Sequence, residues 1–266
     1  AKIDVYSDLA MEYARNLDLP NYLASARVVH CYRHSFFGNW RAFDQEMEQA
    51  LPLLGNPRVA AEHKLGLIMA QISVLIMKGD FVNYQRKKSW LLEAVGKDLT
   101  ARSVVAPFLT IYDINMLIAR EQQAAAKDLI ASALREKGPT AIPHQRSQIL
   151  HFSALLEALD GKTQEAVQAA SESRRLRLEV GPGRFDALNQ IILGTAYALI
   201  SQYEEGEEQL NAALTTVETL QENHLIASAR FNRAYLHLCR GDTPTARRNL
   251  SVALKQMQDQ DYQFFF

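Results

Sequence analysis

This chain of 266 residues has only two cysteines, almost no excess of positive or negative charge, and none of the signature loops of enzymes. The two cysteines, Cys31 and Cys239, lie far apart, which excludes a disulfide framework and is typical of a reducing cytoplasm. The formal net charge is −1, so the chain lacks the overall basic footprint of a stand-alone nucleic-acid-binding protein. We therefore expect a cytoplasmic protein that does not itself bind DNA.

Long apolar runs are missing as well. The most apolar stretch, residues 65–77, is too short to cross a bilayer and contains Gln71 and Ser73, so it predicts a buried helix. No signal peptide is recognisable, and we expect no membrane partner. The aromatic residues 264–266 would need a partner surface, which indicates that the natural chain continues beyond both ends of this sequence.

The motifs of catalysis and of metal or phosphate binding are also missing from the sequence. There is no Gly-x-Ser-x-Gly, no His-Glu-x-x-His and no Cys-x-x-Cys. Gly181-Pro182-Gly183 lacks the Gly-Lys-Ser/Thr of a phosphate loop and indicates an inter-helix turn. We therefore expect a protein that is not an enzyme and that carries no cofactor and no metal.

Two weaker signals have competing interpretations. His30 and His34 have the spacing of a two-histidine metal grip, but they fall at positions where the repeat described below packs its large side chains, and packing is favoured. Short basic runs at 86–88, 174–177 and 247–248 are expected on solvated helix faces, and docking of an acidic partner domain is the alternative.

The sequence does contain an internal repeat. Six short polar turns recur at spacings of 41, 42, 40, 40 and 40 residues, anchored at Gly38, Gly79, Glu121, Gly161, Ser201 and Gly241. Residues five, nine and twelve positions after each anchor share one helical face, and those at five and twelve are mostly small. Each turn therefore joins two helices that approach closely, which we call the first and the second helix of a hairpin.

The first helices are predicted at residues 19–37, 58–78, 100–119, 143–160, 184–200 and 222–240. Most prolines lie near helix starts or turns, where proline is tolerated, and Pro52 and Pro107 are exceptions. No segment alternates with period two. The predicted fold is all-α, a right-handed superhelix (α-solenoid) of about six TPR-like hairpins. One domain spans 1–266, with a capping helix at 1–18 and repeats at approximately 19–56, 57–97, 98–138, 139–181, 182–221 and 222–260.

One repeat carries a family resemblance. Leu193, Gly194 and Tyr197 precede the turn at Ser201, and Gly206, Leu210 and Ala213 follow it, which resembles the tetratricopeptide (TPR) consensus. The period of about 40 residues is similar to that of the helical-repeat sensor domain of MalT-type LuxR-family bacterial transcription activators. This resemblance implies a non-catalytic regulatory domain that responds to an effector, with DNA bound only by domains outside this chain.

A TPR-type superhelix would place part of each first helix on a concave surface. We predict a mainly apolar groove for a small-molecule effector or a peptide or protein partner, and self-association stays open. The alternatives are tight packing at these positions and a TPR protein-protein interaction scaffold or peptide-binding adaptor. The predicted groove residues are Tyr32, Met69, Ser73, Asn115, His151, Thr195, Phe231 and Tyr235.

Overall fold

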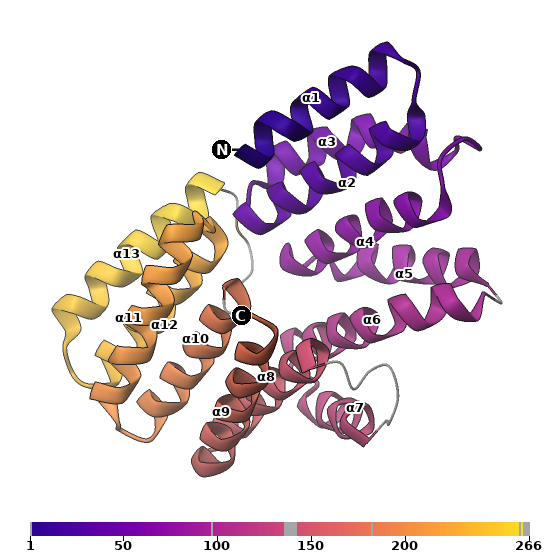
Figure 1. The fold of residues 1–266 in the computed structure, drawn as a ribbon. Helices are drawn as coiled ribbons and strands as arrows, with labels where there is room; N and C mark the ends of the chain where they lie inside the picture. The colour runs from indigo at the N-terminus through magenta and orange to yellow at the C-terminus, as the bar shows by residue number, and fades with distance from the viewer. Residues whose placement is uncertain (1, 97, 136–142, 182, 261, 263–266) are drawn as a thin grey trace. The chain divides into compact units, whose positions relative to one another are not determined.

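The computed structural model describes residues 2–96, 98–135, 143–181, 183–260 and 262, and in these residues it has thirteen α-helices and no strand (Figure 1). This confirms the all-α prediction. Pro182 of the predicted inter-helix turn, residue 139, where a repeat is predicted to begin, and the aromatic residues 264–266 lie outside the described residues. The helices are α1 (Lys2–Asn16), α2 (Pro20–Phe37), α3 (Trp40–Leu54), α4 (Ala61–Met77), α5 (Phe81–Val95), α6 (Leu99–Ala119), α7 (Gln123–Arg135), α8 (Pro143–Leu159), α9 (Thr163–Val180), α10 (Arg184–Leu199), α11 (Tyr203–Leu220), α12 (Asn223–Cys239) and α13 (Thr243–Gln260).

All six predicted anchor residues have positive φ, from 58° at Glu121 to 85° at Gly241. In each turn the amide of the next residue donates to the carbonyl five positions back, as in the 2.9 Å bond from Asn39 N to His34 O. This pair of features is the Schellman motif, which closes a helix by satisfying its last carbonyls. Glycine favours this backbone, yet Glu121 and Ser201 also adopt it.

Two turns between hairpins have the same geometry. Asp18 has φ 48° and Gln221 has φ 58°, and each lies twenty residues before the next anchor. The matching closing bonds run from Leu19 N to Ala14 O at 2.8 Å and from Glu222 N to Val217 O at 3.0 Å. The α1–α2 connection is therefore equivalent to the α11–α12 connection, with α1 in the place of a second helix.

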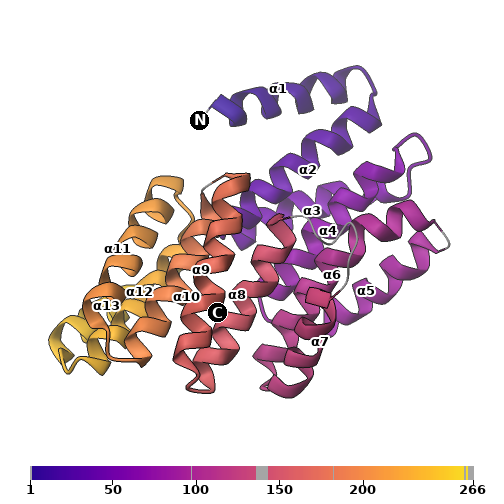
Figure 2. The same ribbon diagram turned by 60° about the horizontal axis from the view of Figure 1, so that its bottom comes forward.

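The chain divides into two compact units, Ala1–Ala94 and Val95–Phe266, each of which is described by itself. In the second unit α6–α7, α8–α9, α10–α11 and α12–α13 are hairpins, and the first helices α6, α8, α10 and α12 contact one another in succession (Figure 2). Each of α7, α9 and α11 also packs against the next first helix. This is the stacking of a TPR-like α-solenoid, in which each hairpin completes the burial of its neighbour.

In the first unit α2 is the central element, because it contacts α1, α3 and α4. Ala24 and Cys31 of α2 are fully buried, as are Tyr84 on α5 and Ala50 on α3. Arg27 is buried in this unit and donates to Glu46 and Gln49, both at 2.7 Å. These contacts hold α2 against α3.

One segment, Thr100–Ala119 in α6, is long and apolar enough to span a membrane on length and composition alone. Within the second unit, however, α6 packs against α7 and α8, and Ile111 and Ile114 are buried in one cluster with Ile130 and Phe152. A core helix passes the same test of length and composition. Pro107 lies inside this helix, as Pro52 lies inside α3.

Helices α10 and α11 approach each other closely at Gly194 of α10 and Gly206 of α11. A Cβ atom at Gly194 would lie 2.7 Å from Leu210 Cγ and 2.9 Å from the Gly206 carbonyl oxygen. A Cβ atom at Gly206 would lie 2.7 Å from Leu236 Cδ1 and 3.0 Å from the Gly194 carbonyl oxygen. Because part of each clash is with backbone, side-chain repacking cannot relieve it.

We therefore expect Gly194→Ala and Gly206→Ala each to lower the free energy of unfolding by about 1–3 kcal/mol, the usual cost of overpacking. Gly55→Ala is the matched control, since a Cβ there meets nothing within 4 Å and φ is −85°. Urea denaturation monitored by circular dichroism measures all three. Equal stabilities for the two α10–α11 variants and the Gly55 control would contradict this account of the hairpin.

Candidate functional site

The eight predicted groove residues fall in both units, three in the first and five in the second. In the first unit Met69 and Ser73 are buried, and Ser73 Oγ donates to the carbonyl of Ala70 at 2.8 Å. Tyr32 is half-buried and packs on Phe36, with ring centroids 5.8 Å apart. Of these three predicted residues, only Tyr32 presents a substantial surface within its unit.

His151 belongs to a buried polar cluster that joins three helices of the second unit. Its Nδ1 lies 2.9 Å from Asn189 Oδ1, and Ser173 Oγ lies 3.0 Å from the same oxygen. Ser147 Oγ donates to the Ser173 carbonyl at 2.8 Å. Burial lowers the pKa of His151 to about 4, so the imidazole is neutral and its Nδ1–H donates to Asn189. The cluster links α8, α9 and α10.

Thr195 also makes a hydrogen bond between repeats. Its Oγ1 lies 2.8 Å from the carbonyl of Ile191 and 2.9 Å from Asn232 Oδ1 on α12. Asn232 Nδ2 in turn donates to the carbonyl of Ser228 at 2.9 Å. Thr195 and Asn232 therefore connect α10 to α12, while Thr195 stays half-exposed.

Asn115 on α6 and Gln148 on α8 differ from these residues, because each has an unpaired oxygen. Both side chains are half-buried, and Asn115 Oδ1 and Gln148 Oε1 are buried atoms without a hydrogen-bond partner among the described residues. The two helices contact each other. Counted back from the anchor turn that ends each first helix, the two residues lie at positions predicted to face the concave side of the stack. Apolar residues of α8 and α10 occupy equivalent positions. We call this set the first-helix face: Asn115, Gln148, Leu155, Leu159, Leu188 and Leu199.

Phe231 and Tyr235 are exposed on α12, with 44% and 36% of their surface accessible. They occupy the repeat positions of Ile191 and Thr195 on α10, where Ile191 is 1% exposed because α11 and α12 pack over it. No further helix follows α13 in the described residues. Among the described residues no helix lies against α12 as α12 lies against α10, and Phe231 and Tyr235 are therefore exposed.

The histidine pair on α2 and the basic run on α9 make contacts within their own units. His30 is buried with Nε2 3.4 Å from Asp8 Oδ1, and its ring lies edge-on to His34. Among the residues that the structure describes, no group of three or more His, Cys, Asp or Glu could hold a metal ion. The basic run on α9 is paired within the unit, as in the 3.0 Å contact from Arg174 Nε to Asp186 Oδ1.

Comparisons with known proteins identify the fold class. No protein-family model matches the chain, and no curated protein matches it. It is similar to the crystal structure of a Rap protein complexed with competence and sporulation factor, with a TM-score of 0.62, 14% sequence identity and coverage of 90% of this chain and 67% of that one. It is also similar to the apo form of RapI, with a TM-score of 0.56, 13% identity and coverage of 91% and 67%.

At these identities the comparison shows a shared fold, a stack of TPR-like helical hairpins. The class defined by fold and site is thus that of TPR-like helical-repeat proteins. The comparison does not single out the MalT-type sensor domain that the 40-residue period suggested.

The buried cluster predicts a pH dependence of stability. Because the folded-state pKa of His151 is about 4 and the ordinary pKa of histidine is 6.5, the unfolded chain binds more protons than the folded chain between these two pH values. Stability is therefore full above pH 6.5 and is lost as the pH falls toward 4. Lowering the pH from 7 to 5 should reduce the free energy of unfolding by about 2 kcal/mol through the titration of His151 alone.

Urea denaturation at pH 7 and pH 5 measures this loss, with His151→Gln as the comparison. Glutamine can still donate to Asn189 but does not titrate, so the variant should lose about 2 kcal/mol less than the wild type over this range. His144, whose pKa is also lowered to about 4 by burial and by Arg177, is retained in both proteins. Identical pH profiles for the two proteins would show that His151 does not titrate as described.

Proposed function

We propose that this chain is a non-catalytic regulatory repeat protein that binds an extended peptide or a protein segment on the first-helix face of its second unit. The observation that carries the proposal is the pair of unpaired oxygens, Asn115 Oδ1 and Gln148 Oε1, on contacting helices. Nearly all buried polar groups in folded proteins have a hydrogen-bond partner, so two such oxygens on one face favour an external donor.

An extended peptide supplies the groups that this face accommodates. Its backbone N–H groups are donors at regular spacing, and its apolar side chains can contact Leu155, Leu188 and Leu199, of which Leu199 is 37% exposed. An unpaired buried amide oxygen costs about 1–3 kcal/mol, so pairing it on binding contributes to affinity. An apolar face with a few fixed polar groups is typical of binding sites.

The similar Rap structure supports binding of a partner over catalysis, because that protein was crystallised with competence and sporulation factor. The thiol of Cys31 is buried beside Met47, and burial raises its pKa to about 12, so it is protonated and not a nucleophile. Cys239 is an exposed free cysteine. A free exposed thiol supports our proposal that the protein works in the cytoplasm.

Selection of twelve-residue peptides from a random display library, followed by calorimetry with the synthetic peptides, tests the proposal. We expect Asn115→Leu and Gln148→Leu each to raise the Kd of selected peptides by up to about tenfold, because each removes one acceptor. The same changes should leave the melting temperature unchanged or raised, since each removes an unpaired buried oxygen.

Gln209→Leu is the matched control. Gln209 Oε1 is also buried and unpaired, but this residue lies on the second helix α11, away from the first-helix face. Its replacement should leave Kd unchanged. If no peptide binds more tightly than about 100 μM, or if the Gln209 variant weakens binding as much as the other two, the proposal is wrong.

A more specific candidate function follows from the repeat period of about 40 residues, which resembles that of MalT-type activators. In this proposal the chain is the sensor domain of a bacterial transcription activator, and an effector shifts the stability of two conformations of the stack. DNA would then be bound by domains outside this chain. Calorimetry against candidate metabolites tests it, since a domain of this kind should show heat of binding and a higher melting temperature with its effector.

A further inference from the structure

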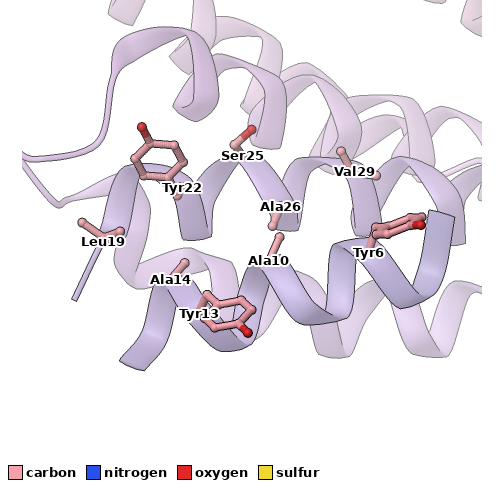
Figure 3. A pocket seen from close by; sticks show the side chains of 9 residues that line it. All are labelled: Tyr6, Ala10, Tyr13, Ala14, Leu19, Tyr22, Ser25, Ala26 and Val29. Carbon is pink, nitrogen blue, oxygen red and sulfur yellow. The ribbon is translucent and has the colours of Figure 1, made fainter. Parts of the chain in front are cut away.

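Two features of the described residues lie outside the first-helix face. One is an open groove of about 590 Å³ between α1 and α2 of the first unit, and only uncharged residues line it (Figure 3). Its lining does not select one class of ligand. The other is Arg177 in the last turn of α9, in the second unit. Arg177 is only 8% exposed, and a buried positive charge requires a negative partner.

Two uncharged side chains contact the guanidinium group of Arg177. Its Nη1 donates to His144 Nδ1, and its Cζ lies 4.3 Å from the ring centroid of Phe185. Burial and Arg177 lower the pKa of His144 to about 4, so this imidazole is neutral at pH 7. His144 is the second residue of α8 and Phe185 the second residue of α10, and these helices contact each other. Arg177 therefore lies against the first turns of two neighbouring helices.

The carboxylates of this cluster are engaged with other arginines. Asp186 Oδ1 lies 3.0 Å from Arg174 Nε, and Glu222 Oε2 lies 2.8 Å from Arg184 Nε. Arg177 itself forms no ion pair with any residue that the structure describes. Three guanidinium groups therefore share two carboxylates, and the charge of Arg177 is the one left over.

Other sources of negative charge offset Arg177 only in part. The carbonyl end of α9 carries about half a negative charge, against a full positive charge on the guanidinium group. Segment 136–142 lies outside the described residues, and it contains one acidic and one basic residue, Glu136 and Lys137, so it adds no net charge. Burial lowers the pKa of Arg177, and the nearby Asp186 offsets this only partly. The cluster therefore has an excess of positive charge.

Hydrogen-bond donors remain available beside this charge. The Nε and Nη2 atoms of Arg177 form one edge of the guanidinium plane, have no acceptor among the described residues and are not completely buried. Such an edge presents two parallel N–H groups, which bind two oxygens of one oxyanion. In α10 the first intrahelical bond runs from Ala187 N to Gly183 O, so the amides of Phe185 and Asp186 have no acceptor within the helix. First-turn amides of this kind bind anions.

We propose that Arg177 binds the phosphate group of a small molecule through its Nε–Nη2 edge, at the N-terminal end of α10. A phosphate suits this place better than a carboxylate, because it carries up to two negative charges and has further oxygens for helix amides. Since Arg177 is only 8% exposed, a small ion reaches it more readily than a segment of a folded partner. The site contains no residue of the first-helix face, and the inference does not depend on the proposed function.

Calorimetric titration of the full chain with inorganic phosphate, at pH 7 and constant ionic strength, tests the proposal. We expect a Kd of about 1 mM or lower, raised at least about tenfold by Arg177→Gln. Arg175→Gln is the matched control, because it removes the same charge from the same helix. The Arg175 side chain is 56% exposed and pairs with Glu172 and Glu179, so its replacement should leave the Kd of phosphate unchanged.

Several outcomes of this titration would overturn the proposal. They are the absence of saturable binding of phosphate, an equal effect of the Arg175 and Arg177 variants on Kd, and an equally low Kd for acetate. Binding of phosphate by Glu136→Gln but not by the wild type would show that the chain's own Glu136 compensates Arg177, and it overturns the proposal as well.

The titration of His144 in the wild-type chain gives a second measurement that needs no variant of Arg177. Bound phosphate compensates the charge of Arg177, which is one cause of the low pKa of His144. The pKa of His144, measured from its imidazole resonances by NMR, should therefore rise in saturating phosphate, and His144→Gln assigns the resonances. Phosphate that binds without raising this pKa occupies another place and overturns the proposal.

Discussion

The packing of each first helix into the groove left by its neighbours is the constraint on which the rest of this structure depends. A single hairpin has apolar surface on more than one side and cannot bury it alone. In the second unit α10 is covered by α8, α9, α11 and α12, and its residues Ala187, Ile191 and Leu193 are almost inaccessible. The turns, the small residues and the hydrogen bonds between repeats all serve to hold helices in this arrangement.

Much of the fold could be predicted from the sequence because its signals are local and repeated. A polar turn every 40 residues with a small residue at a fixed distance is enough to place hairpins, and the six anchors do have the left-handed backbone. Five of the six first helices begin within one residue of the predicted start, and the exception is the helix predicted from Arg58, which begins at Ala61. Asn56 Oδ1 accepts the Arg58 amide at 2.8 Å there, and this local bond holds a turn instead of a helix start.

The candidate site was less predictable, because it depends on which side chains meet between repeats. Nothing local in the sequence indicates that His151 meets Asn189, which lies 38 residues away, or that Thr195 meets Asn232 at a separation of 37. The repeat position of Asn115 follows from the sequence. That position does not show whether its side-chain oxygen has a hydrogen-bond partner on a neighbouring helix. Ligand binding by the eight predicted groove residues stays a prediction.

The nearest-neighbour contacts within the first unit have a consequence for how a change in one of its helices spreads to the others. Of the helices that follow α1 in that unit, α2 contacts both α3 and α4. Added order in α2 is therefore passed directly to two more helices, whereas α1 has its main contact with α2 alone. A structural change in α2 would act at the best-connected helix of this unit, whereas a change in α1 would reach α3 and α4 mainly through α2.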